Sequence, residues 1–226
     1  SKGIYKSLNC GKGSKDKIAN IGKNLKIVSR KIGCKSRNLV SLNQIHSNKV
    51  LKINNVPKKK LTGDAMITNK RNIAISILTA DCAPILIIEQ KQKFIGAIHA
   101  GWKGAFKGIV KKTIQLLKKN GCSEKDMIAC IGPCIKKNSY EVKNDFFKLF
   151  KDKNKKNVNF FTFKKKKIFF DLSKYIKSQF YENGVKKIDI IRKDTYALEN
   201  NFFSSRRSKK NKHNDYGRNI SAIMIK

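Results

Sequence analysis

The stretch IAISILTADCAPILII, from Ile73 to Ile88, is the longest apolar stretch of the chain. Asp81 and Pro84 interrupt it near its middle, which excludes a continuous helix through a membrane. β-Branched residues dominate on both sides of the interruption, and such runs are typical of buried strands. The stretch therefore predicts two strands, 73–78 and 85–89, that are joined by a turn at Asp81 and Cys82.

Strands and helices alternate outward from this turn. Further strands are predicted over 38–45, 50–53, 64–68, 94–98, 127–131, 187–192 and 222–225. Helices are predicted over 15–32 with Ser14 as N-cap, from 106 to about 121, over 142–150, and from the cap Asp171 to about 182. The lysine-dense residues 151–167 are expected to form a surface excursion. The pattern predicts an α/β (α+β) fold with mixed sheets, and a length of 226 residues fits a single domain, 1–226.

The net charge of +37 suggests a protein that binds nucleic acid, because clustered cations neutralise phosphates. Only seven of the 52 basic residues are arginine, however, and specific recognition favours arginine's planar fork. The lysines are spread along the whole chain beside abundant Asn and Ile, all of which have A/T-rich codons. We therefore expect only weak, non-specific binding of nucleic acid, and a lysine-rich RNA-associated protein is the alternative outside enzymes.

Six cysteines occur without any Cys-X-X-Cys pair, so no compact zinc knuckle or disulfide framework is visible. Free thiols are typical of a reducing compartment. The first residues, from Ser1 to Lys6, form no apolar signal region. We therefore expect a cytoplasmic protein that does not act at a membrane.

His46, Cys82 and His99 each lie beside a turn at the end of an apolar run, and the chain has only three histidines. Two imidazoles and one thiolate can hold a zinc ion with a fourth position open, which is typical of catalytic zinc. The spacing matches no zinc finger, and a second interpretation stays open. Cys82 could instead be a nucleophile with His99 as its base and Asp81 orienting the histidine.

Two further features are candidates for binding an anion. The turn from Gly101 to Gly104 opens a helix, whose free backbone amides can hold a phosphate. Arg206 and Arg207 form the one arginine pair of a chain that otherwise uses lysine, which indicates a geometric need such as an anion fork or an ion pair.

Ten segments in order along the chain resemble the YfiH family, also called the multicopper polyphenol oxidase or laccase-domain family. The two most specific are Thr79-Ala80-Asp81-Cys82 and His99-Ala100-Gly101-Trp102. The others are Ser7-Leu8-Asn9, Gln44-Ile45-His46-Ser47, Gly63-Asp64-Ala65, Ile131-Gly132-Pro133-Cys134 with Tyr140-Glu141-Val142, Asp171-Leu172, Thr195-Tyr196 with Glu199-Asn200, Phe202-Phe203-Ser204 with Arg206-Arg207, and Gly217-Arg218.

The resemblance implies β-sheets packed together under outer helices, and zinc held by His46, Cys82 and His99, with copper less expected. It implies a purine nucleoside phosphorylase acting on adenosine, inosine, guanosine and methylthioadenosine with phosphate, together with adenosine deaminase activity. Copper-dependent polyphenol oxidation is the alternative activity, but a multicopper centre needs more histidines than this chain has.

Phosphorolysis needs groups that bind the nucleoside and the phosphate, and several residues are candidates for these roles. Asn9 and Gln44 are expected to contact base or ribose, and the candidates for substrate or phosphate also include Asp81, Lys103, Arg206 and Arg207. The chain departs from the family pattern where Lys103 replaces an arginine, and Asp194 stands where a cysteine often precedes Thr-Tyr. The family's first strand is expected to be absent before Ser1.

Overall fold

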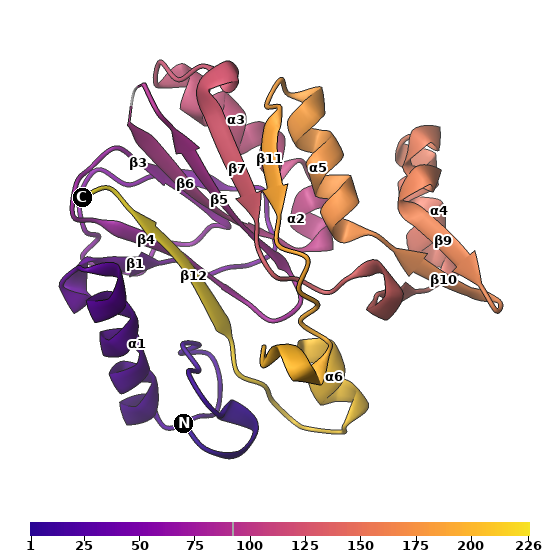
Figure 1. Ribbon diagram of the computed structural model, residues 1–226, viewed down its shortest axis with the longest axis horizontal. Coiled ribbons are helices and arrows are strands. Elements are labelled where there is room, and N and C mark those ends of the chain that lie inside the picture. Colours follow the sequence, from indigo (N-terminus) through magenta and orange to yellow (C-terminus); the bar gives the residue numbers. More distant parts are fainter. Residues whose placement is uncertain (92) are drawn as a thin grey trace.

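The computed structural model describes residues 1–91 and 93–226 and contains a six-stranded mixed sheet with the strand order β11-β7-β5-β6-β3-β2 (Figure 1). Its strands are β2 (Val50–Lys52), β3 (Ala65–Thr68), β5 (Ala83–Glu89), β6 (Phe94–Ala100), β7 (Met127–Ile131) and β11 (Lys187–Ile190). The central strands pair antiparallel, whereas β2 with β3 and β7 with β11 pair parallel at the two edges.

Two small sheets complete the β-structure. The first has the order β1-β4-β12 and packs on one face of the large sheet; its strands are β1 (Leu39–Ser41), β4 (Ala74–Thr79) and β12 (Asn219–Met224). The second has the order β8-β10-β9, with strands β8 (Glu141–Val142), β9 (Phe161–Lys164) and β10 (Lys167–Phe170).

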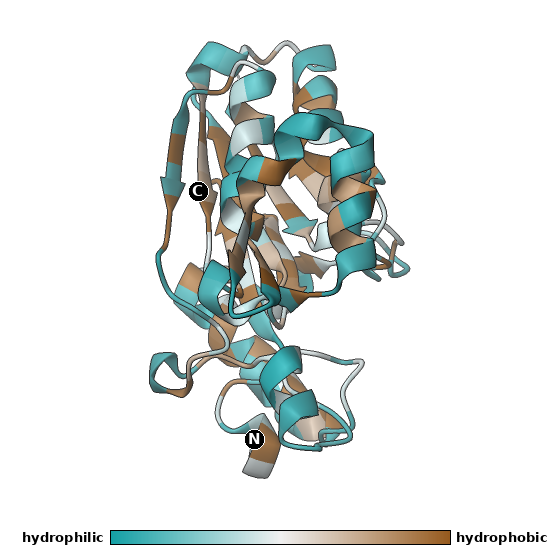
Figure 2. Cartoon of the chain, turned by 90° about the vertical axis from the view of Figure 1, so that its right-hand side faces the viewer, coloured by the Kyte–Doolittle hydropathy of each residue, from teal (hydrophilic) through white to brown (hydrophobic). Residues whose placement is uncertain are grey.

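Helices cover the opposite face of the large sheet. These are α2 (Trp102–Phe106), α3 (Ile109–Lys119) and α5 (Leu172–Glu182), while α1 (Ile18–Ile32), α4 (Asn144–Lys153) and α6 (Ser205–Lys210) lie around the margin. Short 3-10 turns occur at Gly3–Tyr5, Ser36–Asn38, Glu124–Asp126, Lys137–Ser139, Lys155–Phe160 and Leu198–Asn200. Figure 2 shows apolar residues concentrated on the strands and polar residues on the outer surfaces of the helices.

Strand β5 has a continuous apolar sequence because both of its faces are covered. Ile85 and Ile87 pack into the cluster beneath the helices, whereas Leu86 and Ile88 pack on the cluster shared with the small sheet. Because successive side chains of a strand point to opposite faces, a strand covered on both sides has no polar face. The predicted pair of buried strands and the predicted α+β class with mixed sheets and outer helices are confirmed.

Two predicted helix boundaries were wrong. Helix α1 begins at Ile18, with Lys17 at its N-cap, because the Ser14 hydroxyl instead donates to the Gly11 carbonyl and accepts from Asn9 within the preceding loop. The helix predicted from residue 106 begins only at Ile109, because Gly108 adopts a left-handed conformation (φ 81°) that separates it from α2, a short helix where a turn was predicted.

The lysine-dense stretch 151–167 is largely exposed at the surface, as predicted, but it contains regular structure that was not predicted, namely the end of α4, a 3-10 turn and strand β9. Within the stretch Asn157 and Phe161 are buried, and the ring centroid of Phe161 lies 5.9 Å from that of the fully buried Phe150. The exposed lysines concealed in the sequence the hairpin that β9 forms with β10. None of the helices among the described residues has both the length and the apolar character needed to cross a membrane.

Asp215 joins the N-terminal loop to the segment before β12. Its carboxylate accepts hydrogen bonds from the Tyr5 hydroxyl (2.8 Å) and the Lys15 amide (2.6 Å), and lies 3.6 Å from the Arg218 guanidinium. Burial acts to raise the pKa of Asp215, but these donors outweigh it and lower the pKa below its usual value.

We expect Asp215→Asn to lower the free energy of unfolding at pH 7 by about 1–2 kcal/mol, because the replaced oxygen leaves donors unpaired. The depressed pKa contributes stability above the unfolded-state pKa near ~4 and loses it as the pH falls through the folded-state value. Denaturant unfolding of both proteins should therefore show a difference that shrinks in acid. A difference that stays constant from neutral to acidic pH would contradict this account.

Candidate metal centre and its cleft

The end of β6 brings the candidate ligands together. In the large sheet His99 pairs with Pro84 of β5, and Ile98 pairs with Ala65 of β3. The residues that immediately precede β5 and β3 therefore flank His99 on both sides, and these include Cys82 and Asp64. The register of three neighbouring strands, rather than spacing in the sequence, builds the site.

The ligand triad (His46, Cys82 and His99) has ligand atoms that all lie within 4.8 Å of one another. Cys82 Sγ is 3.7 Å from His46 Nε2, and the two imidazole rings meet edge to face with centroids 4.7 Å apart. Tetrahedral zinc with bonds of about 2.3 Å to sulfur and 2.0 Å to nitrogen separates such atoms by about 3.6 Å. The donor set and its spacing thus fit a zinc ion, and the predicted triad is assembled.

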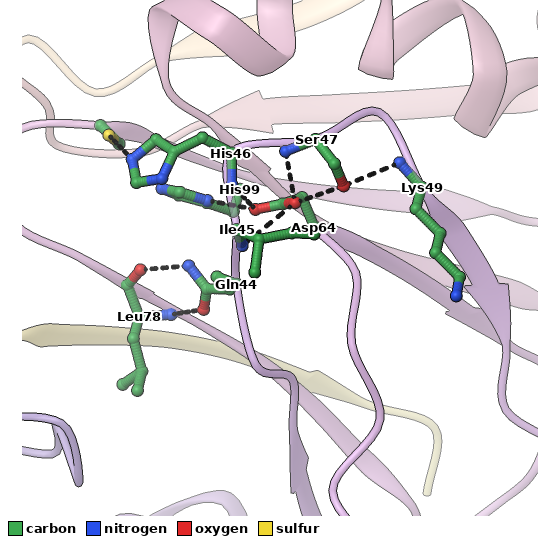
Figure 3. A network of polar contacts seen from close by, with 9 residues as sticks. Gln44, Ile45, His46, Ser47, Lys49, Asp64, Leu78 and His99 are labelled. Carbon is green, nitrogen blue, oxygen red and sulfur yellow. Dashed lines mark hydrogen bonds and ion pairs between the residues drawn. The ribbon is translucent and has the colours of Figure 1, made fainter.

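Asp64 holds both histidines of the triad in place (Figure 3). Its carboxylate is fully buried and accepts from His99 Nδ1 (2.9 Å) and from the backbone amides of His46 (2.9 Å) and Ser47 (2.6 Å). The Ser47 hydroxyl donates a further bond of 2.6 Å. Because His99 donates a hydrogen bond from Nδ1 to Asp64, Nε2 is the ring nitrogen that can bind a metal once it has lost its proton, an arrangement common behind zinc-bound histidines.

The loop that carries His46 is shaped by the same carboxylate. His46 has a φ of 57°, in the left-handed region that a β-branched or bulky residue adopts only when its surroundings impose it. Consecutive amides turned toward one anion provide that constraint. Sequence reasoning suggested Asp81 as the residue that orients His99 if Cys82 is a nucleophile. In the structure Asp64 contacts His99, and Asp81 accepts from Thr195 Oγ1 (2.8 Å) and the Arg206 amide (2.7 Å) at the start of α6.

The charges in the site favour the thiolate. Burial acts to raise the pKa of Cys82, but the charge of His99 and the hydrogen bond from His46 lower it to about 6. Burial likewise opposes the charging of His99, yet Cys82 and Asp64 raise its pKa to about 9. Burial acts to raise the pKa of Asp64, and hydrogen bonds from His99 and Ser47 lower it to about 2. Cys82 is thus poised as a thiolate, the form that ligates metal or attacks as a nucleophile.

Gly101 provides the space for the triad. A Cβ atom added at Gly101 would lie 2.8 Å from Cys82 Sγ and 2.9 Å from His46 Cδ2. Residues 101–104, predicted as a turn that cradles phosphate, are the N-cap and first residues of α2, and they pack against the His46 loop, since a Cβ at Gly104 would lie 2.9 Å from the Ser47 carbonyl. The triad therefore requires a residue without a side chain at position 101. In the sequence this glycine indicated only a turn.

The triad opens into a cleft of about 290 Å³. We call it the triad cleft, and its other lining residues are Lys12, Gly13, Leu42, Asn43, Gln44, Lys60, Leu78, Thr79, Ala80, Tyr216 and Arg218. The lining comes from the N-terminal loop, the His46 loop, the turn before β5 and the segment before β12. Sequence reasoning did not select Lys12, Lys60, Tyr216 or Arg218, although Arg218 lies in a quoted motif.

The other predicted substrate contacts lie in different surroundings. Gln44 lines the cleft, but its amide exchanges two hydrogen bonds with the Leu78 backbone (2.7 and 2.9 Å). Asn9 is fully buried and bonds to Ser14, Asp16 and the amides of Gly11 and Arg218. Lys103 is exposed, with its ammonium 5.6 Å from the Trp102 ring centre. Their roles in binding substrate stay predictions.

The arginine pair serves the backbone rather than the triad cleft. Arg207 donates to the carbonyls of Thr195, Tyr196 and Phe202. Arg206 donates to the Glu141 carbonyl (2.9 Å) and lies over the Tyr140 ring, at a second, aromatic cavity of about 630 Å³. Neither guanidinium lines the triad cleft, and the predicted anion fork stays a prediction.

We expect Asp64→Asn to weaken metal binding by about 10–100-fold, because an amide nitrogen cannot accept from the donors around it. The unpaired donors should also lower the free energy of unfolding by about 3 kcal/mol. Metal titration and denaturant unfolding measure both effects. Asp126→Asn is the control, since Asp126 forms only a surface ion pair with Lys91; equal metal affinities for the two variants would contradict the role of Asp64.

We expect Gly101→Ala to weaken metal binding by about tenfold or more while the fold is kept, since the added carbon forces Cys82 or His46 to move. Gly22→Ala is the matched control, because Gly22 lies in α1 with nothing within 4 Å of an added Cβ. Metal titration measures the affinity of both variants, and circular dichroism checks that both keep the fold. An unchanged affinity in Gly101→Ala would show that the triad tolerates the side chain.

The whole chain is similar to proteins of one known family. The family model described as multi-copper polyphenol oxidoreductase laccase matches residues 1–226. A Rickettsia conorii protein named purine nucleoside phosphorylase is 35% identical over 195 residues, covering 85% of this chain and 80% of the relative. A Bacteroides thetaiotaomicron protein of the same name is 32% identical over 240 residues, covering 100% and 87%.

The fold agrees as well. The crystal structure of the Bacillus licheniformis hypothetical protein YfiH superposes with a TM-score of 0.91 at 22% identity, covering 100% of this chain and 88% of that one. With a family match along its whole described length and relatives above 30% identity, the chain belongs to the laccase-like YfiH family.

Proposed function

We propose that this protein is a zinc-dependent purine nucleoside phosphorylase whose reaction takes place in the triad cleft. The observation that carries the proposal is the convergence of two imidazoles and one thiolate at the wall of a cleft of about 290 Å³. The names of the Rickettsia and Bacteroides relatives support the same activity. Adenosine, inosine, guanosine and methylthioadenosine are the proposed substrates, with inorganic phosphate as co-substrate.

Phosphorolysis joins a phosphate oxygen to C1′ of the ribose while the bond from C1′ to the purine nitrogen breaks. The purine leaves with the bonding electrons and takes up a proton, and ribose 1-phosphate is the second product. The cleft must therefore hold a nucleoside and an anion side by side. When bound by the triad, zinc supplies a Lewis acid that activates water or polarises a substrate oxygen.

The chain's own residues keep the triad ready for this role. Asp64 fixes the ring of His99 and the loop of His46, so the ligand atoms need little reorganisation on binding. The charge of His99 keeps Cys82 deprotonated near neutral pH, where its pKa of about 6 favours the thiolate. We further propose that adenosine deamination, in which water adds to the base carbon and ammonia leaves, uses the same cleft.

Copper-dependent polyphenol oxidation is the alternative that the family description suggests. Among residues 1–91 and 93–226, the triad is the one group of three or more metal-ligating side chains found together. His213, the third histidine, lines a different cavity with Phe203 and Asn211. This distribution favours one metal ion per chain rather than the several coppers of a laccase.

We expect the protein purified without added metal to contain about one zinc per chain, and Cys82→Ala to lose it. Cys34→Ala is the control, because Cys34 lies after α1 and outside the triad cleft. Elemental analysis of the three proteins gives the result. More than one copper per chain would favour the oxidase instead, and a folded protein without metal would favour Cys82 as a nucleophile with His99 as base.

We expect turnover of inosine to depend on the triad, with a loss of about 100-fold or more in kcat/KM when all three ligands are replaced by alanine. Phosphate-dependent release of hypoxanthine, and release of ammonia from adenosine, measure the two proposed activities. Turnover that survives the triple replacement would place the reaction elsewhere. Polyanion binding without turnover, lost steeply with added salt, would favour the RNA-associated alternative.

A further inference from the structure

Two ammonium groups of the triad cleft have no counter-charge. Within the described residues, Lys12 and Lys60 line the cleft without a hydrogen-bond or ion-pair partner for their side chains, and the lining there contains no acidic residue. Arg218, the third cation, is already engaged, since it lies 3.6 Å from Asp215 and donates to the Tyr216 carbonyl (2.6 Å). Lys12 and Lys60 are thus the cations of the cleft that are available to a ligand.

The fold holds these two lysines close to each other although they come from distant segments. Lys12 lies in the loop before α1, and Lys60 in the loop between β2 and β3. Burial and the charge of Lys12 both lower the pKa of Lys60, so the two ammonium groups repel each other across the cleft. Like charges brought together without a carboxylate destabilise the folded chain, and a visiting anion relieves that repulsion.

The nearby carboxylates do not serve as partners. Asp64 is occupied by His99 and the His46 loop, and Asp16 accepts from Ser1, Asn9 and Asn20. The lysine pair therefore stands apart from the general excess of lysine on this chain. Lys12 and Lys60 are exposed like most lysines of this chain, but they are the two lysines that line the cleft containing the triad.

We propose that Lys12 and Lys60 bind the phosphate co-substrate in the triad cleft, beside the ligand triad. The proposal rests on the proposed phosphorolysis and assigns its anion site, which sequence reasoning had sought at Arg206, Arg207 and the Gly101 turn. Two ammonium groups offer up to six donors to the phosphate oxygens, and such charge-assisted bonds are among the strongest in proteins. The bound phosphate then lies within the same cleft as the nucleoside whose C1′ it attacks.

The test compares two double variants that remove the same charge. Lys12→Gln with Lys60→Gln removes the proposed site, and Lys15→Gln with Lys58→Gln removes two exposed lysines from the same loops that do not line the cleft. Binding of inorganic phosphate to the metal-loaded protein is followed by calorimetry in 0.15 M potassium chloride, about physiological ionic strength. The KM values for phosphate and inosine are measured in parallel.

We expect Lys12→Gln with Lys60→Gln to weaken phosphate binding by about tenfold or more, with a matching rise in the KM for phosphate and little change in the KM for inosine. The control pair should bind phosphate within about twofold of the parent protein, since Lys15 and Lys58 do not line the cleft and act on its contents only across screened solvent. Removing the mutual repulsion should leave thermal stability equal or higher, so a loss of binding would not reflect unfolding.

Equal phosphate binding by the two double variants would overturn the proposal, as would a parent protein that does not bind phosphate at all. The outcome for the site and the outcome for the function are separable. Lysine-dependent phosphate binding without nucleoside cleavage would leave the anion site standing and refute phosphorolysis. Nucleoside cleavage that does not depend on Lys12 and Lys60 would support phosphorolysis and refute the anion site.

Discussion

The buried carboxylate of Asp64 is the constraint on which the rest of the site depends. It accepts from the side chain of His99 and from the loop that carries His46, so one anion sets the position of two of the three candidate ligands. A carboxylate in this position would be costly to bury without donors. The groups that donate to this carboxylate are the same groups that must be oriented to bind a metal. The hydrogen bonds that stabilise the His46 loop therefore also fix the positions of the ligands.

Much of this architecture was predictable from the sequence. Apolar runs located every strand of the large sheet, because buried strands need continuous or alternating apolar residues whatever their neighbours. Strand β9 within the exposed stretch 151–167 was not predicted, because the lysines there outnumber the aromatic residues and conceal the strand pattern. Helix α6 (Ser205–Lys210) was not predicted either. Serine is a preferred N-cap residue, so Ser204 was a usable signal in the sequence, and in the structure its hydroxyl accepts from the Arg207 amide.

The candidate ligands could be identified in the sequence because histidine is rare in this chain. The orienting role of Asp64, which supports two of these ligands, was not identified. Asp81 was suggested for the orienting role because it adjoins Cys82 in the sequence, whereas Asp64 approaches His99 only through the pairing of β3 with β6. Nothing in the sequence distinguishes Lys12 and Lys60 from the other lysines among the 45 of this chain. Only the fold does so, because it brings the two loops that carry them to the same cleft.

The two parts of the site become available at different times as the chain is made. The triad, its orienting carboxylate and Gly101 all lie between Gln44 and Gly101, in strands that pair with one another. Tyr216 and Arg218, which line the triad cleft, are synthesised only after all of these residues. A chain emerging from the ribosome thus presents its complete ligand set long before it presents a closed cleft, so metal capture can precede competence for substrate.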